Sequence, residues 1–279
     1  MTKAQHSDLK AVNEFLSERM GLFFSEQRLS DLGRGLKEAC PELSFARAED
    51  LCQELLSDKF DRNKLRILAQ YLTVGETYFF RDPASFLALE ESVLPPLLRK
   101  KRAAKRLKIW SAGCSSGEEP YSIAISLLRS IPDINNWEIK LLATDINMRS
   151  LERAREARYS SWSFRSMPEE FISQYFSEEA DGQFSLNEKI KKMVKFDYLN
   201  LAEDKYSKSG IPNDLDLIFC RNVLIYFTQA KAKDIAEQLG QCLHPEAYLF
   251  TSANDSARFI ANPPQNLERA ASTIFKKRN

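Results

Sequence analysis

LKIWSAGCSSGEEPYS, residues 107–122, is the most informative segment of the chain. An apolar run typical of a buried strand leads into a turn of small residues, and a helix is predicted to begin at about Glu118. In open α/β sheets a nucleotide-like ligand lies at this junction, because a glycine such as Gly113 permits close backbone approach. When this segment is taken alone, the alternative is a tight strand-to-helix turn without a ligand, in which the acidic side chains interact favourably with the helix dipole.

The loop does not have the chemistry of a phosphate site. It carries no Lys-Ser or Lys-Thr pair of the P-loop kind, and Glu118 and Glu119 lie where a phosphate would be repelled. Acidic side chains at this position instead suit a cationic or hydroxyl-rich ligand.

Around this segment, short apolar runs alternate with helical patterns, which predicts a largely parallel sheet covered on both faces. The predicted strands are residues 107–110, 139–143, 193–196, 215–220 and 248–251. The predicted helices lie near residues 118–129, 149–157 and 230–242. Aromatic and polar residues interrupt the alternation between 155 and 195, with a hairpin turn expected at 180–183.

The region before this alternation has helical periodicity. Apolar residues recur at three- and four-residue steps through residues 7–72, which predicts about four short helices in a small, nearly neutral domain. Asp82-Pro83 predicts a helix start, with the carboxylate as N-cap and the proline at the first helical position. We interpret the basic run at 99–106 as solvated surface, with docking of an acidic partner as the alternative.

Composition excludes several classes of function. The chain has 279 residues, of which 43% are hydrophobic, and 40 basic side chains balance 39 acidic ones. This balance gives no argument for a nucleic-acid or membrane-surface partner, and we expect no nucleic-acid partner. Five cysteines without CxxC spacing and only two histidines argue against a disulfide framework, a metal centre and a Ser-His-Asp triad. The N-terminus has no signal-peptide pattern and no run of 18 apolar residues occurs, so we expect a cytoplasmic protein without membrane insertion.

Two further segments place polar side chains at the ends of predicted strands. Asp145, just past the second strand, is well placed to accept hydrogen bonds from a ribose diol; the alternative is that it caps the next helix. Arg221 and Asn222 follow the strand at 215–220, on the side where ligands bind. Asn222 as a helix cap and Tyr226 as a core aromatic are the alternatives there.

Five segments, in this order, resemble the CheR-type chemotaxis methyltransferases: TYFFRD (77–82), WSAGCSSGEEPYS (110–122), ATDI (143–146), FDYLNL (196–201) and DLIFCRNVLIYF (216–227). The match spans roughly residues 15–250. The resemblance implies an α/β fold of the class I, Rossmann-like methyltransferase type at 81–279, preceded by an all-helical domain at 1–80. It also implies a small β-subdomain inserted at about 160–195.

The same resemblance implies a donor and a site. The donor is S-adenosylmethionine, the product is S-adenosylhomocysteine, and no metal is involved. The implied cofactor-binding residues are Thr77, Arg81, Ala112, Gly113, Glu118, Asp145, Asn200, Leu201, Arg221 and Asn222. Glu118 is expected to hold the methionine ammonium, Asp145 the ribose hydroxyls, and Asn200 with Leu201 the adenine. Arg81 and Tyr226 are the implied catalytic residues: Arg81 orients the acceptor carboxylate, and Tyr226 lies beside the methyl group.

The implied activity is formation of glutamate methyl esters on the cytoplasmic part of chemoreceptors, by a monomeric protein-glutamate O-methyltransferase. A glutamate carboxyl, with a reference pKa of about 4.3, is ionised at neutral pH and needs no general base. A non-catalytic module that senses the cofactor or a partner is the alternative. A Rossmann oxidoreductase is disfavoured because the chain lacks G-x-G-x-x-G.

The sequence departs from the family pattern in three places. Gly75 stands where relatives commonly carry Asn, so we expect one contact to be missing. Residues 251–256, TSANDS, replace a Gly-x-x-Glu pattern, so we expect a looser far edge of the site. Basic and acidic residues are interleaved at 26–38, and acceptor recognition does not follow from the sequence.

Overall fold

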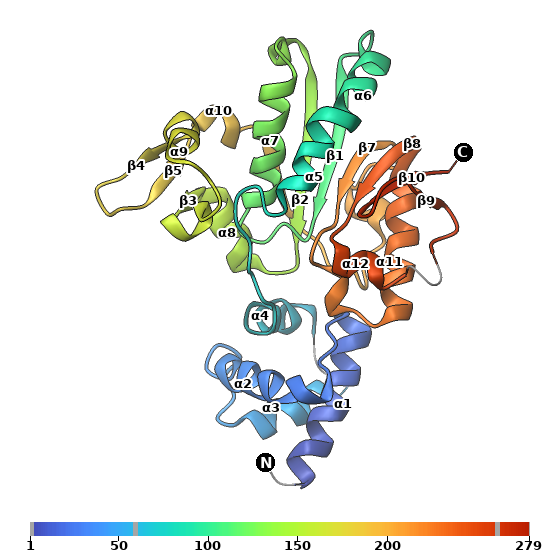
Figure 1. Ribbon diagram of the computed structural model, residues 1–279. Coiled ribbons are helices and arrows are strands. Elements are labelled where there is room, and N and C mark those ends of the chain that lie inside the picture. The colour runs from blue at the N-terminus through green and yellow to red at the C-terminus, as the bar shows by residue number, and fades with distance from the viewer. Residues whose placement is uncertain (1–2, 58–60, 260–262, 279) are drawn as a thin grey trace.

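The computed structural model describes residues 3–57, 61–259 and 263–278 (Figure 1). Its N-terminal part contains the helices α1 (Lys3–Arg19), α2 (Leu29–Ala39), α3 (Ala48–Leu55) and α4 (Arg62–Leu72), with the short 3-10 helix η1 (Glu26–Arg28). Their apolar faces bury a separate core that includes Leu16, Leu32, Leu36 and Leu51. The helical periodicity of this region is confirmed.

The remainder is built on a seven-stranded sheet of order β6-β2-β1-β7-β8-β10-β9. The strands are β1 (Arg106–Ala112), β2 (Glu138–Asp145), β6 (Val194–Tyr198), β7 (Leu215–Phe219), β8 (Leu243–Phe250), β9 (Leu267–Arg269) and β10 (Ile274–Lys277). The first five in this order are parallel, whereas β10 is antiparallel to both β8 and β9. The carboxyl ends of β1, β2 and β7 therefore meet at one edge, which faces the N-terminal helices in Figure 1.

Helices cover both faces of this sheet. On one face lie α5 (Pro83–Ala88), the π-helical segment η2 (Leu89–Val93), α6 (Leu94–Lys101), α7 (Glu118–Ser130) and α8 (Met148–Glu156); α11 (Gln229–Cys242) lies on the other. Because side chains alternate along a strand, Ile109 and Phe219 pack on the α7 side, while Trp110 and Ile218 pack on the α11 side. Burial on both faces explains why the central strands read as apolar runs.

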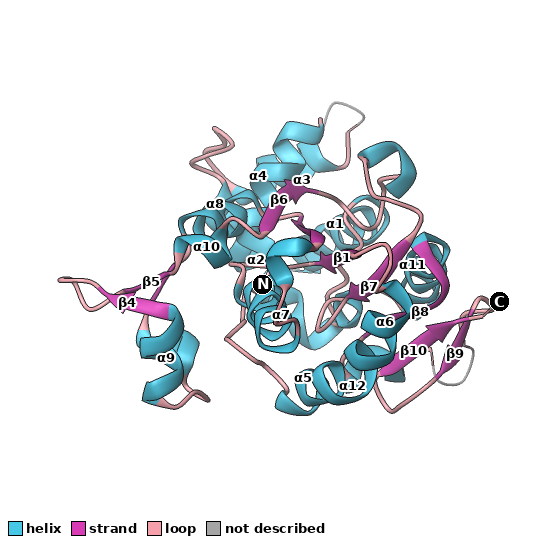
Figure 2. Cartoon of the chain, turned by 90° about the horizontal axis from the view of Figure 1, so that it is seen from above, coloured by secondary structure: helices cyan, strands magenta, loops and turns pink. Residues whose placement is uncertain are grey.

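A three-stranded antiparallel sheet of order β3-β5-β4 lies between α8 and β6 in the chain. It comprises β3 (Arg158–Tyr159), β4 (Phe176–Glu178) and β5 (Phe184–Leu186), with η4 (Ser161–Phe164), α9 (Glu169–Tyr175) and α10 (Glu188–Lys191). The expected hairpin turn joins β4 to β5. The unit projects from the side of the main sheet (Figure 2), and Phe79 stacks on Phe164 at 5.1 Å to anchor its base.

The structure differs from the sequence expectations in three places. The strand expected at 248–251 begins five residues earlier, because Leu243 pairs with Leu215 before a register shift. The hairpin of β9 and β10 was not expected. Asp82 and Pro83 begin α5 as expected, but the carboxylate of Asp82 accepts no backbone N–H of the helix. The residue has a left-handed backbone, φ 62°, and its carboxylate accepts a hydrogen bond from Ser85 Oγ at 2.6 Å. Among the described residues, no helix combines the length and the apolar character needed to cross a membrane.

Candidate active site

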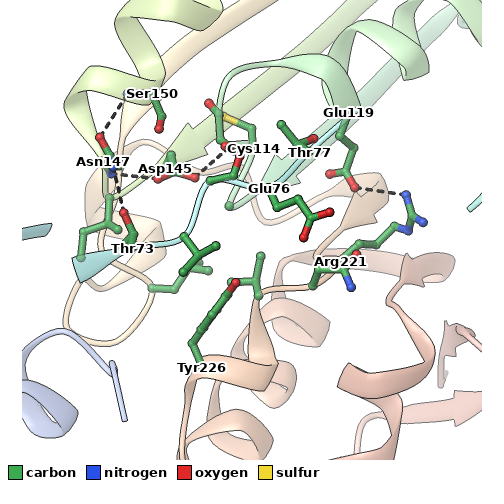
Figure 3. Close-up of a pocket in the computed structure, with 18 of the residues that line it drawn as sticks. Thr73, Glu76, Thr77, Cys114, Glu119, Asp145, Asn147, Ser150, Arg221 and Tyr226 are labelled. Atoms are coloured by element: carbon green, nitrogen blue, oxygen red, sulfur yellow. Dashed lines mark hydrogen bonds and ion pairs between the residues drawn. The ribbon is translucent and has the colours of Figure 1, made fainter. Parts of the chain in front are cut away.

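A pocket lies at the carboxyl ends of β1, β2 and β7 (Figure 3). Its walls come from the end of α1, the segment 73–78 that follows α4, the loop after β1, and the loops after β2, β6 and β7. The expected site residues that line it are Thr77, Arg81, Gly113, Asp145, Asn200, Leu201, Arg221, Asn222 and Tyr226. Ala112 and Glu118 are not among the lining residues, whereas Glu119 is.

The loop after β1 brings backbone directly to the pocket. The N–H groups of Gly113 and Cys114 both donate to the carbonyl oxygen of Thr144, at 2.7 and 2.9 Å. Gly113 has φ 82°, and a Cβ there would lie 2.4 Å from Val223 Cγ2. Glycine is therefore required here both for the backbone conformation and for the space that Val223 occupies.

Asp145 lies at the end of β2 and is held by the loops around it. Its Oδ2 accepts the N–H of Ser115 and its Oδ1 the N–H of Asn147, both at 2.8 Å. Burial raises the pKa of Asp145, and these N–H donors oppose that shift. The helix cap is Asn147, which accepts the N–H of Ser150 at 3.1 Å. Asp145 thus faces the pocket, where it can accept hydrogen bonds from a ligand.

The two adjacent acids at the start of α7 have different surroundings. Glu118 is 3% exposed, and its carboxylate accepts hydrogen bonds from Ser116 Oγ at 2.7 Å and Ser163 Oγ at 3.0 Å. Glu119 lines the pocket, accepts a hydrogen bond from Ser111 Oγ at 2.7 Å and pairs with Arg221 at 3.4 Å. Burial raises the pKa of Glu119, against the opposing effect of Arg221. The pocket-facing acid is therefore Glu119, not the expected Glu118.

Arg221 connects two walls of the pocket through hydrogen bonds and ion pairs. Its Nη2 donates to the carbonyl oxygen of Arg81 at 2.6 Å and lies 3.2 Å from Asp82 Oδ2. Its side chain is only 2% exposed, so these contacts fix its position. The positive φ of Asp82 is sustained by this tie and by Ser85. Arg81 itself donates to the carbonyl oxygen of Glu76 and remains partly exposed at the pocket mouth.

Asn222 lies in the loop after β7 and has φ 58°, and a buried acid supports this loop. Asp255, on α12 (Ala253–Ala257), accepts the N–H of Asn222 and, at 3.0 Å, the N–H of Ile225. It also forms a capping box with Ser252. The edge at 251–256, which was expected to be loose, is instead held by the hydrogen bonds of Asp255. Sequence reasoning missed Asp255; the acid of the replaced Gly-x-x-Glu pattern was the available signal.

The opposite end of the pocket is largely apolar. Met20, Leu22 and Leu201 line it. The side chain of Asn200 is already engaged, since its Nδ2 donates to the carbonyl oxygen of Arg19 at 2.8 Å. Tyr226 reaches the pocket from the loop after β7, and its carbonyl oxygen accepts the N–H of Phe23 at 2.8 Å. The N-terminal helices thus complete a wall that the sheet alone lacks.

The strand order, the glycine loop and the acid after β2 define a class I S-adenosylmethionine-dependent methyltransferase. A family model described as "CheR methyltransferase, SAM binding domain" matches residues 75–271, and the chain belongs to this family. It is 31% identical over 257 residues to "Chemotaxis protein methyltransferase 2" of Vibrio cholerae, covering 92% of this chain and 88% of the relative. It is 34% identical over 268 residues to "Chemotaxis protein methyltransferase" of Borreliella burgdorferi, covering 94% and 88%.

Proposed function

We propose that this methyltransferase forms methyl esters on glutamate side chains in the cytoplasmic part of chemoreceptors. The observation that carries the proposal is a pocket lined by two partly buried acids, Glu119 and Asp145, and by the partly exposed Arg81. Carboxylates in such a pocket suit a cationic, hydroxyl-bearing donor, and a guanidinium in its wall suits an anionic acceptor. Both relatives are named as chemotaxis protein methyltransferases, which supports a role of the methyl transfer in chemotaxis.

The residues of the pocket fit S-adenosylmethionine from end to end. Glu119 would hold the ammonium, in place of Glu118, and Asp145 would accept hydrogen bonds from the ribose hydroxyls. Leu201 with the apolar end of the pocket would contact the adenine. Gly113 lets Val223 pack directly against the loop that lines the pocket, which keeps the loops after β1 and β7 close together.

S-adenosylmethionine supplies a methyl group from its sulfonium, and the glutamate oxygen takes this group as the carbon–sulfur bond breaks. The acceptor is already an anion at neutral pH, so the protein needs no general base. Arg81 would orient the carboxylate through charge-assisted hydrogen bonds, and Tyr226 would help to fix the approach. Alignment of bound reactants lowers a barrier by up to roughly 7–11 kcal/mol, and we assign most of the catalysis to it.

The remaining parts of the proposal concern organisation. We propose a helical domain at 1–80, a methyltransferase domain at 81–279 and an inserted β-subdomain at about 160–195. We also propose that the protein acts as a monomer in the cytoplasm, on methyl-accepting receptor domains.

The test uses labelled S-adenosylmethionine and receptor-containing membranes. Label that base treatment releases as methanol indicates carboxyl esters, whereas base-stable label would contradict the acceptor assignment. Arg81→Ala should abolish most of the transfer, by about 10- to 100-fold for one charge-assisted hydrogen bond. Strong binding of S-adenosylhomocysteine without transfer to any receptor would favour the sensing module instead.

A further inference from the structure

Four side chains form a ladder of alternating rings and guanidinium groups at the pocket mouth. Arg165 lies 3.6 Å from the ring centroid of Tyr78 on one side and 4.5 Å from that of Trp162 on the other. Arg81 lies 5.8 Å from the Tyr78 ring. We call these residues (Tyr78, Arg81, Trp162 and Arg165) the rim ladder. Tyr78 and Arg81 line the pocket, so the ladder runs from the pocket onto the unit inserted between α8 and β6.

The ladder is held in place by its own contacts. Arg165 Nη1 donates to the carbonyl oxygen of Trp162 at 2.9 Å, and Nη2 lies 3.4 Å from Glu76 Oε1. The N–H of Phe79 donates to the carbonyl oxygen of Ser163 at 2.9 Å, which joins the two segments that carry the ladder. A guanidinium fixed between two rings loses little freedom when it binds a carboxylate.

Trp162 is 65% exposed despite its size. Burial of an aromatic ring of this size favours folding, yet here the ring supports Arg165 and leaves most of its surface in solvent. Trp, Tyr and Arg are also the residues that dominate binding energy at protein interfaces. The composition and exposure of the rim ladder are those of a docking surface.

Several other basic groups on the surface of the described residues are already paired. Arg28 and Arg34, on the N-terminal helices, both bind Asp31, at 3.3 and 2.7 Å. In the basic run at 99–106, Lys101 pairs with Asp216 at 2.6 Å and Lys105 with Asp133 at 2.7 Å. The rim ladder has two guanidinium groups, and the carboxylate of Glu76 contacts one of them. Arg81 of the ladder lines the pocket, whereas Arg28, Arg34, Lys101 and Lys105 do not.

We propose that the rim ladder binds an acidic segment of the acceptor protein, beside the glutamate that is methylated. Carboxylates of this segment pair with Arg165 while the acceptor glutamate reaches Arg81, and an apolar neighbour packs on Trp162. This inference rests on the proposed function, because it takes the acceptor to be a protein glutamate. The rim ladder is then the surface that selects the acceptor.

The experiment measures binding of a purified cytoplasmic fragment of a methyl-accepting chemoreceptor to the full chain saturated with S-adenosylhomocysteine. Arg165→Ala and Trp162→Ala should each weaken fragment binding about tenfold or more. Their affinity for S-adenosylhomocysteine should stay within about twofold of the unsubstituted chain. Arg102→Ala, an exposed arginine at the end of α6, is the matched control and should bind the fragment normally. Arg165→Lys keeps the charge without the flat stacking surface and should be intermediate.

Methyl transfer to the same fragment separates the two proposals. If the unsubstituted chain transfers methyl groups and both ladder variants bind and react normally, the docking surface is overturned and the function stands. If fragment binding depends on the ladder but no transfer occurs, the docking surface stands and the proposed function fails. A fragment that does not bind the unsubstituted chain also overturns the docking surface.

Discussion

Asp255 accepts the backbone N–H of Asn222, although 33 residues separate them in the chain. The acid comes from the helix after β8, and the asparagine from the loop after β7. The same carboxylate accepts the N–H of Ile225, one residue before Tyr226. One buried side chain therefore fixes the loop that carries three of the expected site residues, Arg221, Asn222 and Tyr226.

Replacement of Asp255 by Asn should damage both stability and activity. The amide would set its NH₂ group against N–H donors that the carboxylate now satisfies, at a cost of about 1–3 kcal/mol in the free energy of unfolding. Methyl transfer should fall at least about tenfold, because Tyr226 loses its support. Thermal melting and initial rates measure the two effects. Asn254→Ala, on the exposed side of the same helix, is the control; equal effects of both variants would remove Asp255 from this role.

The adjacent acids Glu118 and Glu119 should respond differently to loss of charge. Glu119→Gln should weaken S-adenosylhomocysteine binding about 10- to 100-fold, since a hydrogen bond to a charged group contributes about 1.5–3 kcal/mol. Glu118→Gln should leave the affinity within about threefold, because Ser116 and Ser163 hold that side chain away from the pocket. Calorimetric titration decides between them. If Glu118→Gln instead weakens S-adenosylhomocysteine binding more than Glu119→Gln does, Glu118 is the residue that binds the ammonium.

Ligand binding should also depend on pH. Burial raises the pKa of Glu119 and of Asp145, so these groups keep a proton to higher pH than the ordinary value of about 4. Only the ionised form of Glu119 attracts an ammonium. The affinity for S-adenosylhomocysteine should therefore rise with pH through the raised pKa and level off above it. Titrations between about pH 5 and about pH 8 test this, with Glu119→Gln giving a flatter profile. An affinity that falls across the range would contradict it.

The sequence predicted the pocket well because its position follows from local pattern. The apolar run to Ala112, the small-residue loop and the acid after β2 each lie within a short window. The choice between Glu118 and Glu119 depended instead on Ser163, which arrives from the inserted unit and binds Glu118. The left-handed backbone of Asp82 likewise depends on Arg221, from the loop after β7. Contacts of this kind join segments that are far apart in the chain, so no local sequence pattern predicts them.

Two glycines with similar backbone angles offer a matched test of the pocket. Gly113 has φ 82° and Gly182 has φ 75°, so alanine is strained at both. That strain costs about 1–2 kcal/mol at each position. At Gly182 the added Cβ meets nothing within 4 Å, whereas at Gly113 it would lie 2.4 Å from Val223 Cγ2.

Gly182→Ala should therefore lower the free energy of unfolding by about 1–2 kcal/mol and leave ligand affinity unchanged. Gly113→Ala should destabilise the protein further, because Val223 must move, and this movement reaches the loop that carries Asn222 and Tyr226. Binding of S-adenosylhomocysteine should weaken by at least about tenfold, consistent with 1–3 kcal/mol for overpacking of a close contact. Denaturant unfolding and calorimetry on both variants give the comparison. If Gly113→Ala binds the ligand as Gly182→Ala does, the close contact between residue 113 and Val223 does not shape the pocket, because the strain is common to both variants and only this contact differs.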